Sequence, residues 1–222
     1  MTRTVLAVMI CAGCEFGGGP GVAGRITDGS TKPVDAAKKP DGPGSGSGSN
    51  MSMCAQPMAS GVVATWAFAG QPGNQASTAA ASAAPGTTAG AIARSSDLAA
   101  DVGLDSMNST TWPMTSTLDT TKGYYTLSIT PPANCTLDLT AASIQGRQSG
   151  SGPASVAIGT SADGFAQTVA LTVSPTDATS TPALAVTGAA AAVELRIFGY
   201  GASGTAGTFR LDGTLTVTGS IQ

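Results

Sequence analysis

The sequence contains no histidine and few charged side chains. Of its 222 residues, 10% are charged and 5% are aromatic, whereas charged residues normally make up about 25% of a soluble protein. Without histidine, Ser-His-Asp and Cys-His catalysis, histidine-ligated zinc and the usual proton shuttle near neutral pH are excluded. The 10 Lys and Arg residues against 13 Asp and Glu residues give a weak net charge of -3, so nucleic acid is not an expected partner.

The first residues have the order of an export signal. Arg3 supplies a positive charge, residues 4–10 (TVLAVMI) are apolar, and small residues follow at once. The apolar run is far shorter than the roughly 20 residues that span a bilayer. We therefore predict a signal peptide over residues 1–13. The alternatives are a secretory signal cut elsewhere and a start codon placed upstream of an ordinary domain.

The end of this signal resembles the lipobox of bacterial lipoproteins, because Ala12 and Gly13 directly precede Cys14. The resemblance implies cleavage before Cys14 and a diacylglycerol on its thiol, which would hold the protein to membrane lipid. One departure is Cys11, at a position where the family favours Leu. The expected location is the cell envelope after export, at the outer membrane or cell surface.

A tether is expected over residues 14–53. This stretch contains GGGPG, PDGPG and GSGSGSN and offers almost nothing that a core could bury. Such Gly/Ser/Pro-rich sequence does not offset its chain entropy, so we predict a flexible, disordered linker. Its composition also resembles the spacers that follow the lipidated cysteine in many myxobacterial surface lipoproteins.

Residues 54–222 read as strands joined by Gly, Ser, Pro and Asn turns. The clearest strand covers residues 208–221, where Phe209, Leu211, Leu215, Val217 and Ile221 alternate with Thr, Arg and Asp side chains. Residues 61–68 place Val62, Ala64, Trp66 and Phe68 on one side. Alternation of this kind indicates antiparallel sheet with one buried face. We predict an all-β domain, an antiparallel β-sandwich that is jelly-roll-like.

The region from residue 70 to residue 118 has few large apolar side chains. We expect long loops there, with one or two short strands near residues 89–95 and around Trp112.

Two cysteines remain in the predicted mature domain, Cys54 and Cys135. An even pair in an exported domain is most simply a disulfide, and it would fix the chain where the tether enters the domain. The alternative is two free buried thiols.

Several segments in the second half together resemble a bacterial extracellular β-sandwich module. They are residues 124–129 (YYTLSI), 147–153 (RQSGSGP), 160–165 (TSADGF), 195–202 (LRIFGYGA) and 207–213 (GTFRLDG). The module occurs in surface proteins of myxobacteria, planctomycetes and Bacteroidota and is similar to a carbohydrate-binding jelly roll. The resemblance implies binding without catalysis and leaves a structural calcium open. Where the family often continues Leu-Asp-Asn, this chain has Gly213.

Four polar residues are the candidate ligand-binding set: Arg196, Tyr200, Arg210 and Asp212. We expect them on the polar faces of two adjacent strands. A sugar site needs an aromatic platform beside planar hydrogen-bonding groups, and Tyr200, Tyr124 or Trp112 could supply the ring. The alternative is a tyrosine packed at a strand end and solvated arginines.

No catalytic residues are expected. The carboxylates of the domain show no spacing typical of a glycosidase pair, and we interpret Glu194 beside Arg196 as a surface ion pair. Asp97, Asp101 and Asp105 lack the order of a calcium loop and are interpreted as solvated loop carboxylates.

The sequence thus favours a non-catalytic surface lipoprotein whose module binds a polysaccharide or a surface protein, with glycan as the leading ligand. The alternatives are a structural or accessory envelope protein without a small ligand and, least favoured, a glycan-active hydrolase.

Overall fold

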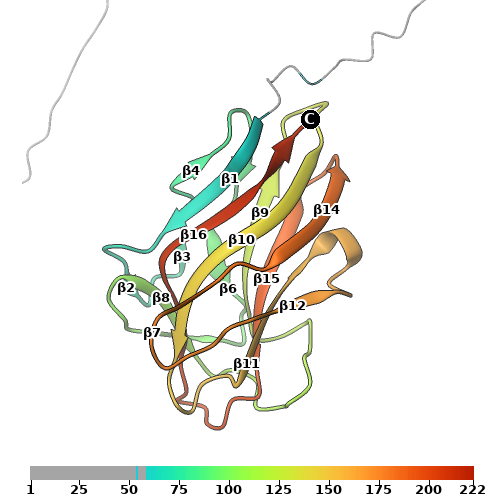
Figure 1. The fold of residues 1–222 in the computed structure, drawn as a ribbon. Helices are drawn as coiled ribbons and strands as arrows, with labels where there is room; N and C mark the ends of the chain where they lie inside the picture. The colour runs from blue at the N-terminus through green and yellow to red at the C-terminus, as the bar shows by residue number, and fades with distance from the viewer. Residues whose placement is uncertain (1–53, 55–58) are drawn as a thin grey trace, which may run out of the picture. The chain divides into compact units, whose positions relative to one another are not determined.

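The computed structural model describes Cys54 and residues 59–222, which form a two-layer β-sandwich (Figure 1). Within these residues there is no α-helix, and the one helical turn is the 3-10 helix η1 (Ser161–Asp163). The predicted signal peptide, Cys14 and the predicted tether all lie outside the described residues. The predicted fold class, an all-β sandwich, is confirmed.

The first layer is a nine-stranded sheet in which β16 lies between β1 and β10 (Figure 1). Its central path is β13 (Ala178–Ser180), β10 (Leu137–Gln148), β16 (Phe209–Ile221), β1 (Ala59–Ala67) and β4 (Ser82–Ala83). Beside this path, β14 (Ala183–Ala189) pairs with β10, β8 (Ser106–Thr110) pairs with β16, and β2 (Pro72–Gly73) and β7 (Ala99–Asp101) pair with β8.

The second layer is a seven-stranded sheet. Its order is β12 (Thr168–Leu171), β11 (Ser155–Thr160), β15 (Val193–Tyr200), β9 (Tyr124–Thr130), β6 (Ile92–Arg94) and β3 (Ser77–Thr78), with β5 (Thr88–Ala89) beside β9. The described pairings of both sheets are antiparallel except that of β2 with β8.

The alternation in the last strand predicts its buried face correctly. All five apolar residues expected to face inward from β16 are at most 3% exposed. The expectation for β1 is wrong at Val62, which is 56% exposed, while Val63 is buried in its place. The register against β16 shifts between Val62 and Ala64. A β-bulge adds one residue to a strand and so exchanges the faces on either side of it.

Trp112 lies in the core between the two sheets. Its ring packs edge-on against Tyr125 of the seven-stranded sheet and Phe209 of the nine-stranded sheet. The distances between ring centres are 5.4 Å and 5.7 Å, respectively. Its indole N–H donates to the carbonyl of Ser109 at 2.8 Å. Because Trp112 is only 1% exposed, it cannot be the ligand platform that the sequence left open for it.

The predicted disulfide between Cys54 and Cys135 is confirmed, with 4.6 Å between the two Cα atoms. The bond joins residues 81 positions apart. Closing a loop of this length stabilises the folded state by about 4 to 4.5 kcal/mol in the chain-entropy model. The bond also indicates an oxidising, extracytoplasmic environment.

The region expected to be mostly loop carries seven short strands, β2 to β8. Arg94 links several of these strands: its side chain donates to the Ser109 hydroxyl at 2.7 Å and to the carbonyls of Gly73, Gln75 and Asn108. One half-buried side chain thereby joins β6 to β8, to β2 and to the β2–β3 connection. These bonds add to the apolar packing of Ile92 and Met107, and local sequence patterns do not reveal bonds between residues so far apart in the chain.

Among the described residues, none of the helical structure has the length and apolar character needed to cross a membrane.

Candidate functional site

The structure separates the four candidate ligand-binding residues into two pairs. Arg196 and Tyr200 lie on β15 in the seven-stranded sheet, whereas Arg210 and Asp212 lie on β16 in the nine-stranded sheet. The expectation that these two strands are adjacent is therefore wrong. The chain crosses from one sheet to the other between Tyr200 and Phe209, so consecutive strands are not neighbours.

Arg196 is held between two aromatic rings on the outer face of the seven-stranded sheet. Its guanidinium carbon lies 4.3 Å from the ring centre of Tyr124 and 4.3 Å from that of Phe165. A third ring, that of Phe198, is fully buried beside them. Its centre lies 5.8 Å from the ring centre of Tyr124 and 6.0 Å from that of Phe165. Cation–π contacts with both rings hold the guanidinium in place.

Glu194 completes this cluster and confirms the predicted ion pair. One carboxylate oxygen, Oε1, accepts from Arg196 Nε at 2.7 Å and from the Thr126 hydroxyl at 2.7 Å. Burial by itself would raise the pKa of Glu194, but the hydrogen bonds from Arg196 and Thr126 outweigh it and hold this pKa below its usual value. Glu194 is therefore ionised near neutral pH and acts as a hydrogen-bond acceptor.

Phe165 reaches its place over Arg196 in a costly backbone conformation. Its φ is 63°, in the left-handed region that aromatic residues rarely adopt. Two bonds from its backbone N–H stabilise the turn, one to the carbonyl of Thr160 at 2.9 Å and one to Asp163 Oδ1 at 3.1 Å. Conformations of this kind cost about 1 to 3 kcal/mol and cluster at functional sites.

A cleft of about 410 Å³ opens beside this cluster, and we call it the Glu194 cleft. Its lining is mostly small and polar: Ala91, Thr126, Leu127, Ser128, Ser161, Ala192 and Glu194. Ser161 is placed by η1, where its hydroxyl accepts from the backbone N–H of Glu194 at 2.9 Å. The cleft thus offers three hydroxyl groups and a carboxylate next to a stacked guanidinium. These groups can donate hydrogen bonds to a polar, uncharged ligand and accept hydrogen bonds from it.

Tyr200 lies at the end of β15, paired with Ser155 of β11, and is half-buried. It is not among the residues that line the Glu194 cleft. Tyr124, which the sequence left as an alternative ring, is the tyrosine that contacts Arg196.

The second pair belongs to a charged cluster on the nine-stranded sheet. Arg210 Nε lies 3.0 Å from Asp212 Oδ1, and Arg147 Nε lies 3.5 Å from Asp177 Oδ1. Asp212 is only 6% exposed. Burial and the neighbouring Asp177 carboxyl raise the pKa of Asp212 to about 7, although Arg147 acts in the opposite direction. This cluster is a compact ion network, and none of its four residues lines either of the two cavities described in this section.

The three loop aspartates considered for calcium bind protein groups instead. Asp97 accepts from the backbone N–H of Gly123 at 2.8 Å, and Asp105 accepts from that of Gly70 at 2.7 Å. Asp101 accepts from the Asn108 amide at 3.2 Å. Within residues 54 and 59–222, no group of three or more Asp, Glu or Cys side chains is placed to hold a metal ion.

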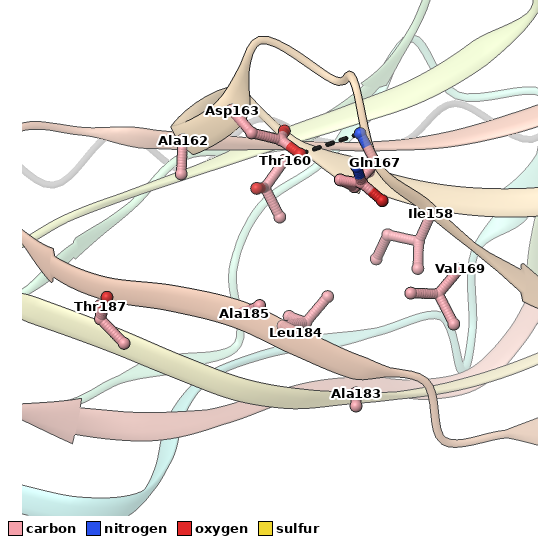
Figure 2. A pocket seen from close by; sticks show the side chains of 11 residues that line it. Ile158, Thr160, Ala162, Asp163, Gln167, Val169, Ala183, Leu184, Ala185 and Thr187 are labelled. Carbon is pink, nitrogen blue, oxygen red and sulfur yellow. Dashed lines mark hydrogen bonds between the residues drawn. The ribbon is translucent and has the colours of Figure 1, made fainter.

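Another cavity, of about 400 Å³, opens at the edge of the sandwich between β12 and β14. Figure 2 shows Ile158, Val169 and Leu184 pointing into it from the two sheets. Asp163 lies at its rim, where its carboxylate accepts from the backbone N–H of Gln167 at 2.9 Å. Thr160, Gln167 and Thr187 also line the cavity, but the described residues lining it include no arginine or aromatic side chain.

No protein-family model matches this chain, and a search among curated proteins also finds no match. The sandwich expected from the family resemblance is present, whereas the family itself is not identified.

Sequence reasoning finds Glu194 and Arg196 and misses two of their partners. Thr126 follows Tyr124 with period two on β9, so the alternation could have placed both on the outer face. Phe165 has no such signal. It comes from the loop after η1, and only the fold of that loop brings its ring onto β15.

Proposed function

We propose that this protein is a non-catalytic binding module of the cell envelope and that its ligand is a glycan. The outer face of the seven-stranded sheet is the proposed binding surface. The proposal is supported by one observation above all: the Glu194–Arg196 pair is fixed between two aromatic rings at the side of a hydroxyl-lined cleft.

This arrangement suits a sugar for chemical reasons. Sugar hydroxyls both donate and accept, and they pair well with a planar guanidinium and an ionised carboxylate. The half-buried rings of Tyr124 and Phe165 add apolar edges against which sugar C–H groups can pack. The backbone strain at Phe165 supports a binding role, because such strain persists where a particular placement is needed.

The second candidate is a structural or accessory envelope protein that binds no small ligand. It is favoured by the state of the aromatic rings. Among the described residues no Trp, Tyr or Phe side chain is fully exposed, and one face of Tyr124 and of Phe165 is covered by Arg196. On this interpretation the cluster fastens the loop after η1 to the sheet and does nothing more.

A screen of the purified domain, residues 54–222 with the disulfide intact, against polysaccharides and glycan arrays separates the two candidates. Calcium is added in one series and chelated in another. Binding that is lost in Glu194→Gln and Arg196→Ala supports the glycan proposal. Arg147→Ala is the matched control, because it removes an arginine from the opposite face. A domain that binds no glycan in either series overturns the proposal in favour of the structural role.

Export and anchoring complete the proposal. The disulfide supports an extracytoplasmic location, and the lipobox-like Ala12-Gly13-Cys14 supports a lipid anchor at the outer membrane or cell surface. Changing Cys14 to Ser in the full chain should release the protein from membranes in cell fractionation. Unchanged retention of this variant in the membrane fraction would contradict the anchor.

A further inference from the structure

A second polar cleft lies next to the loop whose Thr120 carbonyl accepts from Arg196, and we call it the Lys122 cleft. It measures about 320 Å³ and is lined by Asp97, Thr111, Pro113, Met114, Thr115, Asp119 and Lys122. Met114 is 58% exposed, so its apolar side chain is open to contact by a ligand. The cleft therefore combines an apolar contact with charged and hydroxyl groups.

One side chain connects the two clefts. Arg196 donates from Nε to Glu194, which lines the first cleft, and from Nη1 to the carbonyl of Thr120 at 3.0 Å. Thr120 follows Asp119, whose carboxylate accepts from the backbone N–H of Thr121 at 2.9 Å and so shapes the loop that carries Lys122. Along the chain, Tyr124 lies between Lys122 of this cleft and Thr126 of the Glu194 cleft; it is half-buried, and Arg196 lies on its ring.

We infer that the two clefts form one elongated binding surface and that its ligand is an uncharged oligosaccharide long enough to reach from Glu194 across Arg196 to Met114. This inference rests on the proposed glycan-binding function and adds the length and charge of the ligand. Two clefts joined by a fixed arginine suit a chain that presents similar hydroxyl groups at repeated positions.

The charges of the surface select against acidic glycans. Arg196 and Lys122 are its cations, and each is already paired with an acid. Arg196 Nε lies 2.7 Å from Glu194 Oε1, and Lys122 Nζ lies 3.9 Å from Asp119 Oδ2. Asp97 adds a further negative charge in the Lys122 cleft. A uronic acid or sulfated chain would therefore meet three carboxylates and only two cations, both of them paired. A neutral chain avoids this repulsion and keeps the hydrogen bonds.

A length series tests the inference. The disulfide-bonded domain is titrated calorimetrically with xylo-, manno-, cello- and chito-oligosaccharides from the disaccharide to the hexasaccharide, and with alginate and heparin as acidic probes. We expect the hexasaccharide of the preferred series to bind about tenfold or more tightly than its disaccharide, because contacts in the second cleft add to those in the first. Alginate and heparin should bind more weakly than that hexasaccharide.

Variants in the Lys122 cleft locate the added contacts. Met114→Ala should lower hexasaccharide affinity toward the disaccharide value and leave disaccharide affinity unchanged, whereas Met114→Leu should keep most of the gain. Both changes are at an exposed position, and their melting temperatures serve as a folding control.

Three results would overturn the inference while glycan binding itself stands: affinity independent of chain length, a hexasaccharide affinity untouched by Met114→Ala, or a preference for alginate or heparin. If no oligosaccharide binds at all, both the inference and the proposed function fail.

Discussion

The two outer faces of the sandwich carry the same motif, an arginine and an acid two residues apart on one strand. The pKa values of the two acids are nevertheless shifted in opposite directions. On β15 the pKa of Glu194 is lowered, because the bonds from Arg196 and Thr126 outweigh burial. On β16 burial and the Asp177 carboxyl raise the pKa of Asp212 to about 7. Each acid lies within 3.0 Å of its arginine.

The neighbours decide this difference. The Glu194 side chain is 34% exposed and accepts a hydrogen bond from the Thr126 hydroxyl. The Asp212 side chain is 8% exposed and lies beside the carboxyl of Asp177. A hydroxyl donor stabilises the charged form of an acid, while burial and a like charge destabilise it. An ion pair read from sequence therefore does not reveal the charge state of its acid. The predictions below test the comparison, beginning with the largest effect.

Removing the arginine should be most costly on the nine-stranded sheet. Arg210→Ala leaves Asp212 buried beside Asp177 without its adjacent cation, and we expect a loss of about 3 kcal/mol in unfolding free energy at pH 8. At pH 5 the loss should shrink, because Asp212 can take up a proton. Urea unfolding at the two pH values measures both losses. Equal losses would show that Asp212 is charged throughout.

The matching change on the other face, Arg196→Ala, should cost about 2 kcal/mol. It removes cation–π contacts with Tyr124 and Phe165, while Glu194 is exposed enough to be hydrated. This loss should vary little between pH 5 and pH 8 in the same urea experiments. A marked pH dependence here would contradict the contrast between the faces.

The stability of the unaltered domain should fall by about 1 to 2 kcal/mol as pH rises from about 4 through 7. The folded state holds the Asp212 proton more tightly than the unfolded state, so this contribution is complete below the ordinary aspartate pKa and is lost as pH passes the folded value. The size allows for solvent screening at the half-exposed side chains of Arg147 and Asp177.

Asp212→Asn should flatten this slope in thermal or urea unfolding across the pH range. The Glu194 contribution has the opposite sign: it is present above the ordinary glutamate pKa and is lost as pH falls through the lowered folded value. Glu194→Gln should therefore change only the acid side of the profile. An unchanged slope in Asp212→Asn would assign it to another group.

The smallest expected effect is that of Thr126→Val, which removes one hydroxyl donor from Glu194 without changing side-chain size. We expect a loss of about 0.5 to 1 kcal/mol and a rise in the pKa of Glu194, followed by NMR titration of the carboxyl carbon. Thr140→Val is the control, because that hydroxyl bonds Thr218 on the other sheet. A Glu194 pKa that does not move would show that Arg196 alone sets it.

Much of the architecture follows from short-range pattern. The alternation in β16 identifies its buried face, and the cysteine count identifies the Cys54–Cys135 bond. Prediction fails where one residue breaks the period, as at the bulge after Val62, and where polar bonds organise short strands, as around Arg94. Neither feature has a local signature in the sequence.

The candidate site divides in the same way. Glu194 and Arg196 are two apart on one strand, so their pairing could be predicted from a period of two. Arg210 and Asp212 looked like their neighbours only because β15 and β16 are consecutive in the chain. Strand adjacency depends on which sheet each strand joins, and that is settled by pairing partners far away in sequence.

The sequence by itself determined the class of this domain: an all-β fold cross-linked by one disulfide, with few charged residues and no histidine for catalysis. These properties depend on composition and on neighbours along the chain. Only the tertiary structure decided that Tyr124 and Phe165 enclose Arg196 and that Asp177 meets Asp212. Those contacts join residues tens of positions apart, and the pKa of each acid depends on the burial and charge that such contacts create.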